Sequence, residues 1–230
     1  MEDILTSNVF GALKYFSPES ALVPFLSKAS FAQGEKPFED LSANVKVEYK
    51  FWPWVQESDC DGCEPDVLLR ITCPNDRKFL VVVEAKYRPG KSSKEEAGEH
   101  PNDQLAREWE NLKRLAEKEL CEPLLIYLTA DVSYPAQDIE ASQRELANKN
   151  RGKARISWLS WRHLPALITD DSPEMLRDLA EVLRRLNLTF FQGFSTVEEH
   201  PSIQWTFSGP PVYFEWIYVS PEEPLRWRFQ

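Results

Sequence analysis

The spacing of apolar residues along the chain predicts an alternation of helices and strands. Residues 2–16 place an apolar side chain every three or four positions, which is the period of one face of a helix. The same period recurs over 105–116, 136–148 and 173–187. Stretches rich in aromatic and β-branched residues indicate strands between these helices. The predicted strands cover residues 45–55, 67–72, 79–83, 123–129 and 156–159.

The strand predicted at 79–83 says most about the architecture. Its residues, Phe-Leu-Val-Val-Val, are apolar on both faces, which is typical of a central strand covered on both sides. A turn at 74–77 joins it to the strand before, so the two are expected to be antiparallel neighbours. With the strand–helix–strand segments that follow, the pattern predicts an α/β fold in which helices flank a mixed central sheet.

Residues 188–230 differ in character, because they are rich in aromatic residues that lie among prolines and show no helical period. We therefore predict a main domain over 1–187 and an aromatic-rich C-terminal extension over 188–230. The extension is expected to be a β-hairpin or an irregular cap, packed on the core or on a partner. Aromatic residues dominate interface hot spots. A homodimer or partner-subunit contact is therefore one prediction for Trp205, Tyr213, Trp216 and Tyr218.

The composition is that of a folded globular protein, since 42% of the 230 residues are hydrophobic and 28% are charged. No apolar run approaches the roughly 20 residues that cross a bilayer. The chain starts with the acidic Met1-Glu2-Asp3, where a signal peptide would be basic. We therefore expect a cytoplasmic protein without a membrane partner.

Four cysteines in such a chain are expected to be reduced thiols. Cys60 and Cys63 form a CXXC pair that could supply half of a zinc site, with Cys73 and Cys121 as distant partners. The chain has no second CXXC pair and no histidine pair at zinc-finger spacing. A plain acidic hairpin loop around Cys60 and Cys63 is therefore the favoured prediction.

The formal net charge of −10 argues against binding nucleic acid by overall charge alone, because such binding depends on Lys and Arg neutralising phosphates. Local charge differs from this average. The stretch 77–94 carries six basic residues and one acidic residue, and the stretch 144–155 carries five and one. Each could contact a polyanion, or each could be an ordinary solvated face.

The chemistry centres on Asp66, which begins one predicted strand, and on Glu84, which ends its antiparallel neighbour. Side chains alternate across a strand, so Glu84 and Lys86 are expected on one face and Ala85 on the other. Like charges buried together are costly unless a cation compensates them. A divalent cation such as Mg²⁺, held by Asp66, Glu84 and the Ala85 carbonyl, would do so. It would lower the pKa of a bound water, which Lys86 would orient or deprotonate.

The run Glu64-Pro65-Asp66, the apolar strand and then Glu84-Ala85-Lys86 resembles the PD-(D/E)XK signature of restriction-endonuclease-like nucleases. The resemblance covers about residues 1–130. It implies an αβββαβ core with a mixed sheet, dependence on Mg²⁺, for which Mn²⁺ may substitute, and cleavage of phosphodiester bonds, most often in DNA. Asp66, Glu84 and Lys86 would be the catalytic residues.

Two flanking features are similar to the supporting motifs of that family. They are an acidic residue in the first helix, here Glu2, and a glutamine in the helix after the motif, here Gln104. Some branches carry a tyrosine four positions after the glutamine, whereas this chain has Glu108. The loop after the motif offers cations and a hydroxyl for phosphate contact, or is a flexible solvent loop. Its candidate contacts are Arg88, Lys91 and Ser92.

The leading prediction is a metal-dependent nuclease that hydrolyses phosphodiester bonds, most often in DNA, in bacterial defence or in mobile-element processing. The alternative is a catalytically silent restriction-endonuclease-like module that binds or assembles with a partner. Other hydrolase and kinase chemistries lack support, because the chain has no Gly-X-Ser-X-Gly motif and no phosphate-binding glycine loop. The sequence does not distinguish DNA from RNA or duplex from single-stranded nucleic acid, and it indicates no sequence specificity.

Overall fold

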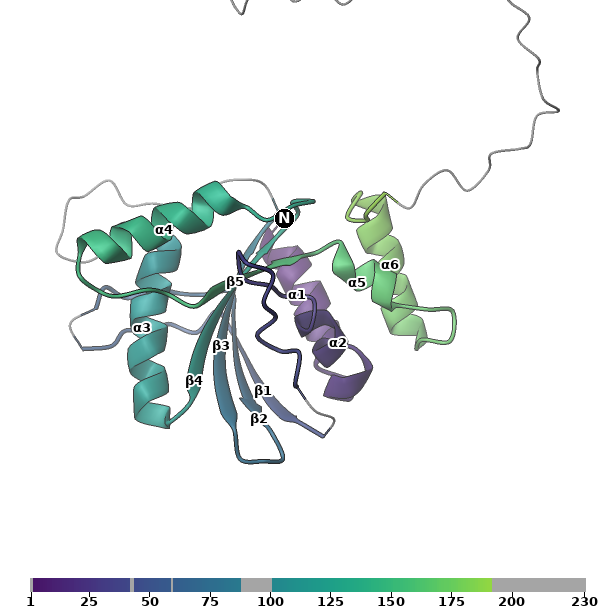
Figure 1. The fold of residues 1–230 in the computed structure, drawn as a ribbon. Helices are drawn as coiled ribbons and strands as arrows, with labels where there is room; N and C mark the ends of the chain where they lie inside the picture. Colours follow the sequence, from purple (N-terminus) through teal and green to yellow (C-terminus); the bar gives the residue numbers. More distant parts are fainter. Residues whose placement is uncertain (1, 42–43, 59, 88–100, 192–230) are drawn as a thin grey trace, which may run out of the picture. The chain divides into compact units, whose positions relative to one another are not determined.

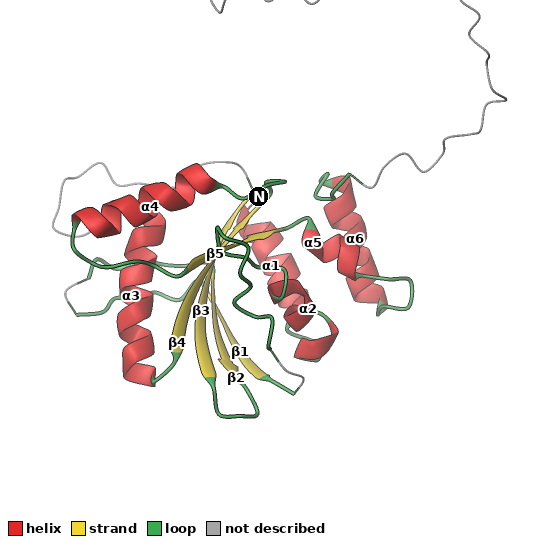
Figure 2. Cartoon of the chain, viewed as in Figure 1, coloured by secondary structure: helices red, strands yellow, loops and turns green. Residues whose placement is uncertain are grey.

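A five-stranded mixed sheet forms the centre of the fold (Figures 1 and 2). The computed structural model describes residues 2–41, 44–58, 60–87 and 101–191. The strands follow one another across the sheet in sequence order; β1 and β3 are antiparallel to β2, whereas β4 and β5 run parallel to β3. The strands are β1 (Lys46–Phe51), β2 (Val67–Thr72), β3 (Lys78–Lys86), β4 (Glu122–Thr129) and β5 (Ile156–Ser160).

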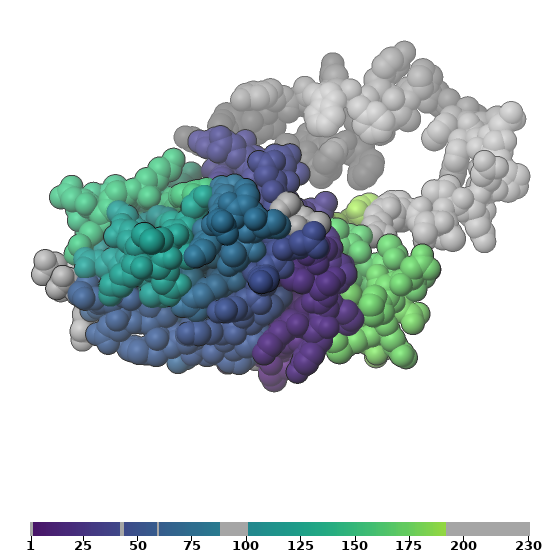
Figure 3. All heavy atoms as spheres, turned by 90° about the horizontal axis from the view of Figure 1, so that it is seen from below, coloured from purple at the N-terminus to yellow at the C-terminus, as the bar shows by residue number. Residues whose placement is uncertain are grey.

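Helices cover both faces of this sheet, as Figure 1 shows. One face packs against α1 (Glu2–Leu13), α2 (Leu22–Leu26), α5 (His163–Leu167) and α6 (Glu174–Arg185), and a short 3-10 turn, η1 (Pro18–Ser20), precedes α2. The other face packs against α3 (Gln104–Glu119) and α4 (Ala136–Asn148). In the space-filling view of Figure 3, the purple helix α1 lies beside the green C-terminal helices, consistent with its contacts to α6. The predicted α/β class with a mixed, flanked sheet is confirmed.

Strand β3 shows why the sequence folds in this way. All of its residues after Lys78 are buried, as the two-sided apolar pattern predicts. Val81, Val83 and Ala85 join the core under α1, whereas Leu80 and Val82 join the core under α3. β3 therefore separates two cores, and the polar residues at its end, Glu84 and Lys86, are buried as well.

The connection from β3 to β4 passes through α3, as a parallel strand pair requires. The helix starts at Asp103, whose side chain accepts a hydrogen bond from the Ala106 N–H at 3.1 Å, and it ends at Leu120 in the left-handed region. The predicted apolar stripe faces the sheet: Leu105, Trp109, Leu112 and Ala116 are all buried. The polar residues at the start of α3 are therefore carried to the end of β3.

Several predicted boundaries differ from those observed. The strand predicted over 45–55 ends at Phe51, because Trp52 has a positive φ of 45° and Pro53 has no N–H to donate. The first helix ends at Leu13 instead of residue 16. The last predicted helix, over 173–187, spans Glu174–Arg185.

The C-terminal extension predicted over 188–230 lies almost wholly outside the described residues, which end at Phe191. Leu188 is buried in the core under α1 and α6, so the folded unit reaches beyond the predicted boundary at residue 187. Among the helices of the described residues, none combines the length and the apolar character that a membrane span needs.

Candidate functional site

The register of β2 and β3 brings Asp66 beside Glu84. Val67 pairs with Val83, so Asp66, one residue before the paired segment, lies next to the end of β3. The Asp66 Oδ2 accepts a hydrogen bond from the Ala85 N–H at 2.8 Å. The tight turn between the strands thus places the two carboxylates together, as the sequence predicted.

Glu84 and Lys86 occupy the same face of β3 and form an ion pair. The Lys86 Nζ lies 2.6 Å from the Glu84 Oε1 and 3.2 Å from the Glu2 Oε1. The second oxygen of Glu2, Oε2, accepts a hydrogen bond from the Tyr87 N–H at 2.8 Å. The start of α1 therefore supplies one carboxylate to the end of β3. Ala85 points to the opposite face, where it is fully buried under α1.

Gln104, the first residue of α3, reaches the same carboxylate. Its Nε2 donates a hydrogen bond to the Glu84 Oε1 at 2.5 Å. One oxygen of Glu84 thus accepts hydrogen bonds from both Lys86 and Gln104, which fixes the orientation of the carboxylate. The predicted residues Glu2, Asp66, Glu84, Lys86 and Gln104 all converge.

Glu108 belongs to this cluster although the sequence analysis did not propose it as a site residue. It follows Gln104 by one turn of α3, contacts Glu84 and Gln104, and is only 1% exposed. Its Oε2 has no hydrogen-bond partner within the described part of the chain. A usable signal existed: positions four apart on a helix share a face, so a helix that presents Gln104 to the site also presents Glu108.

Burial controls the electrostatics of the cluster. Burial raises the pKa of Asp66 to about 7, and the neighbouring charge of Glu84 adds to this. Burial also raises the pKa of Glu84, although Lys86 opposes the shift. The pKa of Glu108 is raised well above its ordinary value by burial and then by Glu84. Burial alone would lower the pKa of Lys86, but Glu84 and Glu2 outweigh it and the net shift is upward. Lys86 is therefore a firmly protonated ammonium.

The side chains that the structure describes at this site fit a hard divalent cation better than a soft one, since they offer carboxylate oxygens. Among the described residues, no three or more His, Cys, Asp or Glu side chains are grouped so that they could together hold a metal ion. In the same part of the chain, three buried carboxyl groups, those of Asp66, Glu84 and Glu108, lie near the buried ammonium of Lys86. Burial makes their ionised forms costly, and a divalent cation would compensate that cost.

The predicted basic stretches are only partly described. Arg88, Lys91 and Ser92, the candidate phosphate contacts, lie outside the described residues. Within the second stretch, Arg151 pairs with Glu110 at 2.8 Å and Arg155 with Glu122 at 3.6 Å. These ion pairs neutralise part of the charge that the sequence suggested for a polyanion.

The cysteine hypothesis of a shared zinc site is wrong. All four cysteines are free thiols. Cys63 precedes β2 and Cys73 follows it, and six strand residues separate the two positions by roughly 20 Å. The Cys60–Cys63 segment is instead part of the loop between β1 and β2. Within this loop, Val55 and Cys63 exchange backbone hydrogen bonds of 2.9 Å.

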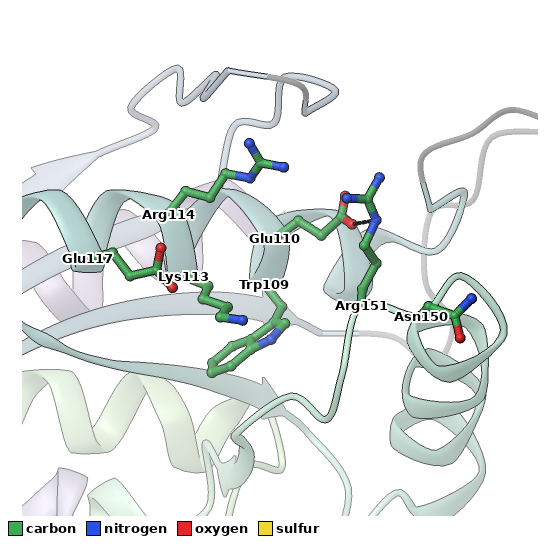
Figure 4. Close-up of a pocket in the computed structure, with 7 residues that line it drawn as sticks. All are labelled: Trp109, Glu110, Lys113, Arg114, Glu117, Asn150 and Arg151. Carbon is green, nitrogen blue, oxygen red and sulfur yellow. Dashed lines mark ion pairs between the residues drawn. The ribbon is translucent and has the colours of Figure 1, made fainter.

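A cavity of about 350 Å³ lies elsewhere, against the middle of α3 (Figure 4). Its lining includes Trp109, Lys113 and the ion pair between Glu110 and Arg151, which Figure 4 marks with a dashed line. None of the clustered carboxylates lines this cavity. Glu110 is buried like Glu108 and belongs to the same helix, but it is held by Arg151.

Comparison of the chain with protein-family models, with curated proteins and with solved structures gave no match. The residues and their geometry therefore carry the functional argument.

Proposed function

We propose that this chain is a metal-dependent nuclease of the PD-(D/E)XK type. The observation that carries the proposal is the convergence of Asp66, Glu84 and Lys86 at the adjoining ends of β2 and β3, in the order and on the faces that the motif requires. The element order α, β, β, β, α, β, disregarding the short turn and helix after α1, and the mixed sheet agree with the core that the resemblance implies.

Asp66, Glu84 and the carbonyl of Ala85 would hold the cation. When bound, Mg²⁺ or Mn²⁺ lowers the pKa of a coordinated water and neutralises charge on the scissile phosphate. Glu84 is already oriented for this role, because Lys86 and Gln104 both donate hydrogen bonds to its Oε1. The Ala85 N–H holds Asp66 in the same way.

Lys86 would serve as a hydrogen-bond donor and a positive charge. Because Glu84 and Glu2 keep its pKa raised, the ammonium retains its proton at neutral pH. It therefore suits orienting the attacking water and stabilising charge on the phosphate better than removing a proton. Glu2 positions this ammonium from α1 through the contact of 3.2 Å.

The substrate proposed is DNA, on the strength of the resemblance, and the setting proposed is bacterial defence or mobile-element processing. The test is cleavage of plasmid and single-stranded DNA with Mg²⁺ or Mn²⁺. Asp66→Asn, Glu84→Gln and Lys86→Met should each lower the rate by at least about 100-fold. Glu122→Gln, which changes a carboxylate paired with Arg77 at the other end of the sheet, is the matched control and should cut normally.

If the three site variants lose cutting while Glu122→Gln retains it, the result would support the proposed nuclease activity. Failure of the wild type to cut DNA or RNA, together with failure to bind either cation, would overturn it. That result would favour the alternative, a silent module that binds or assembles with a partner.

A further inference from the structure

The outer side of β1 is an edge of the sheet that no described strand covers. β1 stands at the end of the strand order and, within the described ranges, pairs only with β2. Its six residues contain no proline and pair with β2 in an unbroken register. An uncovered edge presents backbone N–H and C=O groups that can pair with another strand. This side of β1 is therefore a candidate interaction surface.

One hydrogen bond shows which backbone groups of β1 point outward. The Trp52 N–H donates to the Asp66 carbonyl at 3.0 Å, so this N–H points toward β2. Successive residues of an antiparallel strand turn their backbone groups to opposite sides. The N–H and C=O groups of Val47, Tyr49 and Phe51 therefore point away from β2, toward the open edge.

The side chains of β1 lie on two faces of different character. One face carries half-buried residues that pack against the core under α1, namely Val47, Tyr49 and Phe51. The other face carries exposed charged residues, namely Lys46, Glu48 and Lys50. On this second face a negative charge lies between two positive charges. A strand with this pattern can match the charges of an antiparallel copy of itself.

We infer that β1 pairs with β1 of a second copy of this chain, antiparallel and about a two-fold axis at Tyr49. In this register Tyr49 lies opposite Tyr49 of the second copy, and Val47 lies opposite Phe51. All of these residues use the backbone groups that point outward. Glu48 lies opposite Lys50, and symmetry makes this pair occur twice. Opposite charges that face each other across two strands stabilise a sheet.

The charges favour this register over the neighbouring ones. An axis at Glu48 would place that carboxylate against its own copy and Lys46 against Lys50, and like charges directly opposite are destabilising. An axis at Lys50 would place that ammonium against its own copy. An axis at Val47 would pair Lys46 with Glu48 but would overlap only half of the strand. The axis at Tyr49 combines the long overlap with opposite charges.

The paired copies would join their two five-stranded sheets into one continuous sheet. Tyr49 and Phe51, which are half-buried in the single chain, would lose further contact with water at the new strand pair. The inference does not depend on nuclease activity, since it uses β1 and none of the clustered carboxylates.

Sedimentation velocity of the full-length chain over a range of concentrations measures the equilibrium between monomer and dimer. Glu48→Lys and Lys50→Glu each replace two attractive pairs by two repulsive ones. Each should therefore raise the dissociation constant of the dimer at least about 10-fold. The double variant that exchanges the two charges restores both pairs and should dimerise within about threefold of the wild type.

Lys46→Glu is the matched control, because it makes the same change of charge on the same face of β1. In the inferred register Lys46 lies opposite Trp52 and has no charged partner. This variant should dimerise within about threefold of the wild type.

Val47→Pro tests the backbone pairing without changing any charge. It removes an N–H that points to the open edge and does not serve β2, and an edge strand tolerates proline at such a position. The variant should fold, as circular dichroism melting will show, and its dimer should dissociate at least about 10-fold more readily than that of the wild type.

Two results would overturn the inference. One is a wild type that stays monomeric at every concentration. The other is a dimer that the folded variants at positions 47, 48 and 50 all retain, because another surface would then join the copies. Neither result bears on the nuclease proposal, which DNA cleavage tests separately.

Discussion

At the scale of single residues, the buried carboxylate of Asp66 lowers the stability of the folded protein at neutral pH. Its folded-state pKa of about 7 lies above the ordinary value of 3.8, so the folded protein binds more protons than the unfolded chain between these two values. Stability therefore falls as pH rises from about 4 to about 7 and levels off above. Burial is the main cause, and the charge of Glu84 is the second.

Asp66→Asn should remove this penalty. The asparagine can still accept the hydrogen bond from Ala85, but it carries no charge. Without divalent metal, we expect the variant to melt a few degrees above the wild type at pH 8 and close to it near pH 4. Melting curves across this pH range check the prediction. Asp170→Asn, at an exposed carboxylate, should show no such pH-dependent gain. A gain that stays constant with pH would contradict it.

How far the site could be predicted depends on how its residues are connected. Asp66 and Glu84 could be paired from sequence, because one tight turn joins their strands. Glu2 was named only through the resemblance, and its contact with Lys86 was not predicted, since no local rule joins residues 84 positions apart. Glu108 was not predicted, although its spacing of four residues from Gln104 on α3 indicated a shared helix face.

At the scale of elements, the loop between β1 and β2 is attached to α3 by several side chains, of which Asn111 is the buried one; Arg114 and Lys118 contact Ser58 and Glu57 at the surface. Asn111 is 1% exposed, accepts a hydrogen bond from the Glu57 N–H at 2.9 Å and donates to the Asp61 carbonyl at 2.7 Å. The loop leads directly to Asp66, whose carbonyl accepts from the Trp52 N–H at 3.0 Å. No pattern in the sequence predicted this attachment, because an asparagine within a helix is usually exposed.

Asn111→Leu should leave both loop groups without their partner. We expect a loss of about 2–4 kcal/mol in the free energy of unfolding, since buried backbone groups left unpaired are costly. Urea unfolding followed by tryptophan fluorescence measures this. Asn148→Leu, at an exposed position at the end of α4, should change stability by less than about 0.5 kcal/mol. Equal effects of the two substitutions would show that the hydrogen bonds of Asn111 add nothing to the free energy of unfolding.

At the scale of the whole molecule, the folded unit reaches Phe191. Leu188 is 1% exposed, and the Arg162 Nη1 donates to the carbonyls of Asn187 and Thr189, each at 2.6 Å. The sequence placed the boundary at residue 187, where the helical period ends. Leu188 lies after the helical repeat has ended, so the spacing of apolar residues could not predict that it is buried.

Truncation compares the two boundaries. The reference is a chain that ends at Phe191, the last described residue. A chain ending at Asn187 should lose about 1–3 kcal/mol, because it lacks Leu188 and the Thr189 acceptor. Urea denaturation of both, beside the full chain, gives the comparison. Equal stability of the two truncated chains would place the boundary at 187 after all.

The clustered carboxylates come from α1, from the start of β2, from the end of β3 and from α3, so more than a hundred residues separate the first contributor from the last. During synthesis on the ribosome, Glu2 emerges long before Glu108. A nascent chain that ends before α3 therefore has neither Gln104 to orient Glu84 nor the helix that covers it. If the site cuts nucleic acid, the emerging chain therefore has no complete site until α3 has been made.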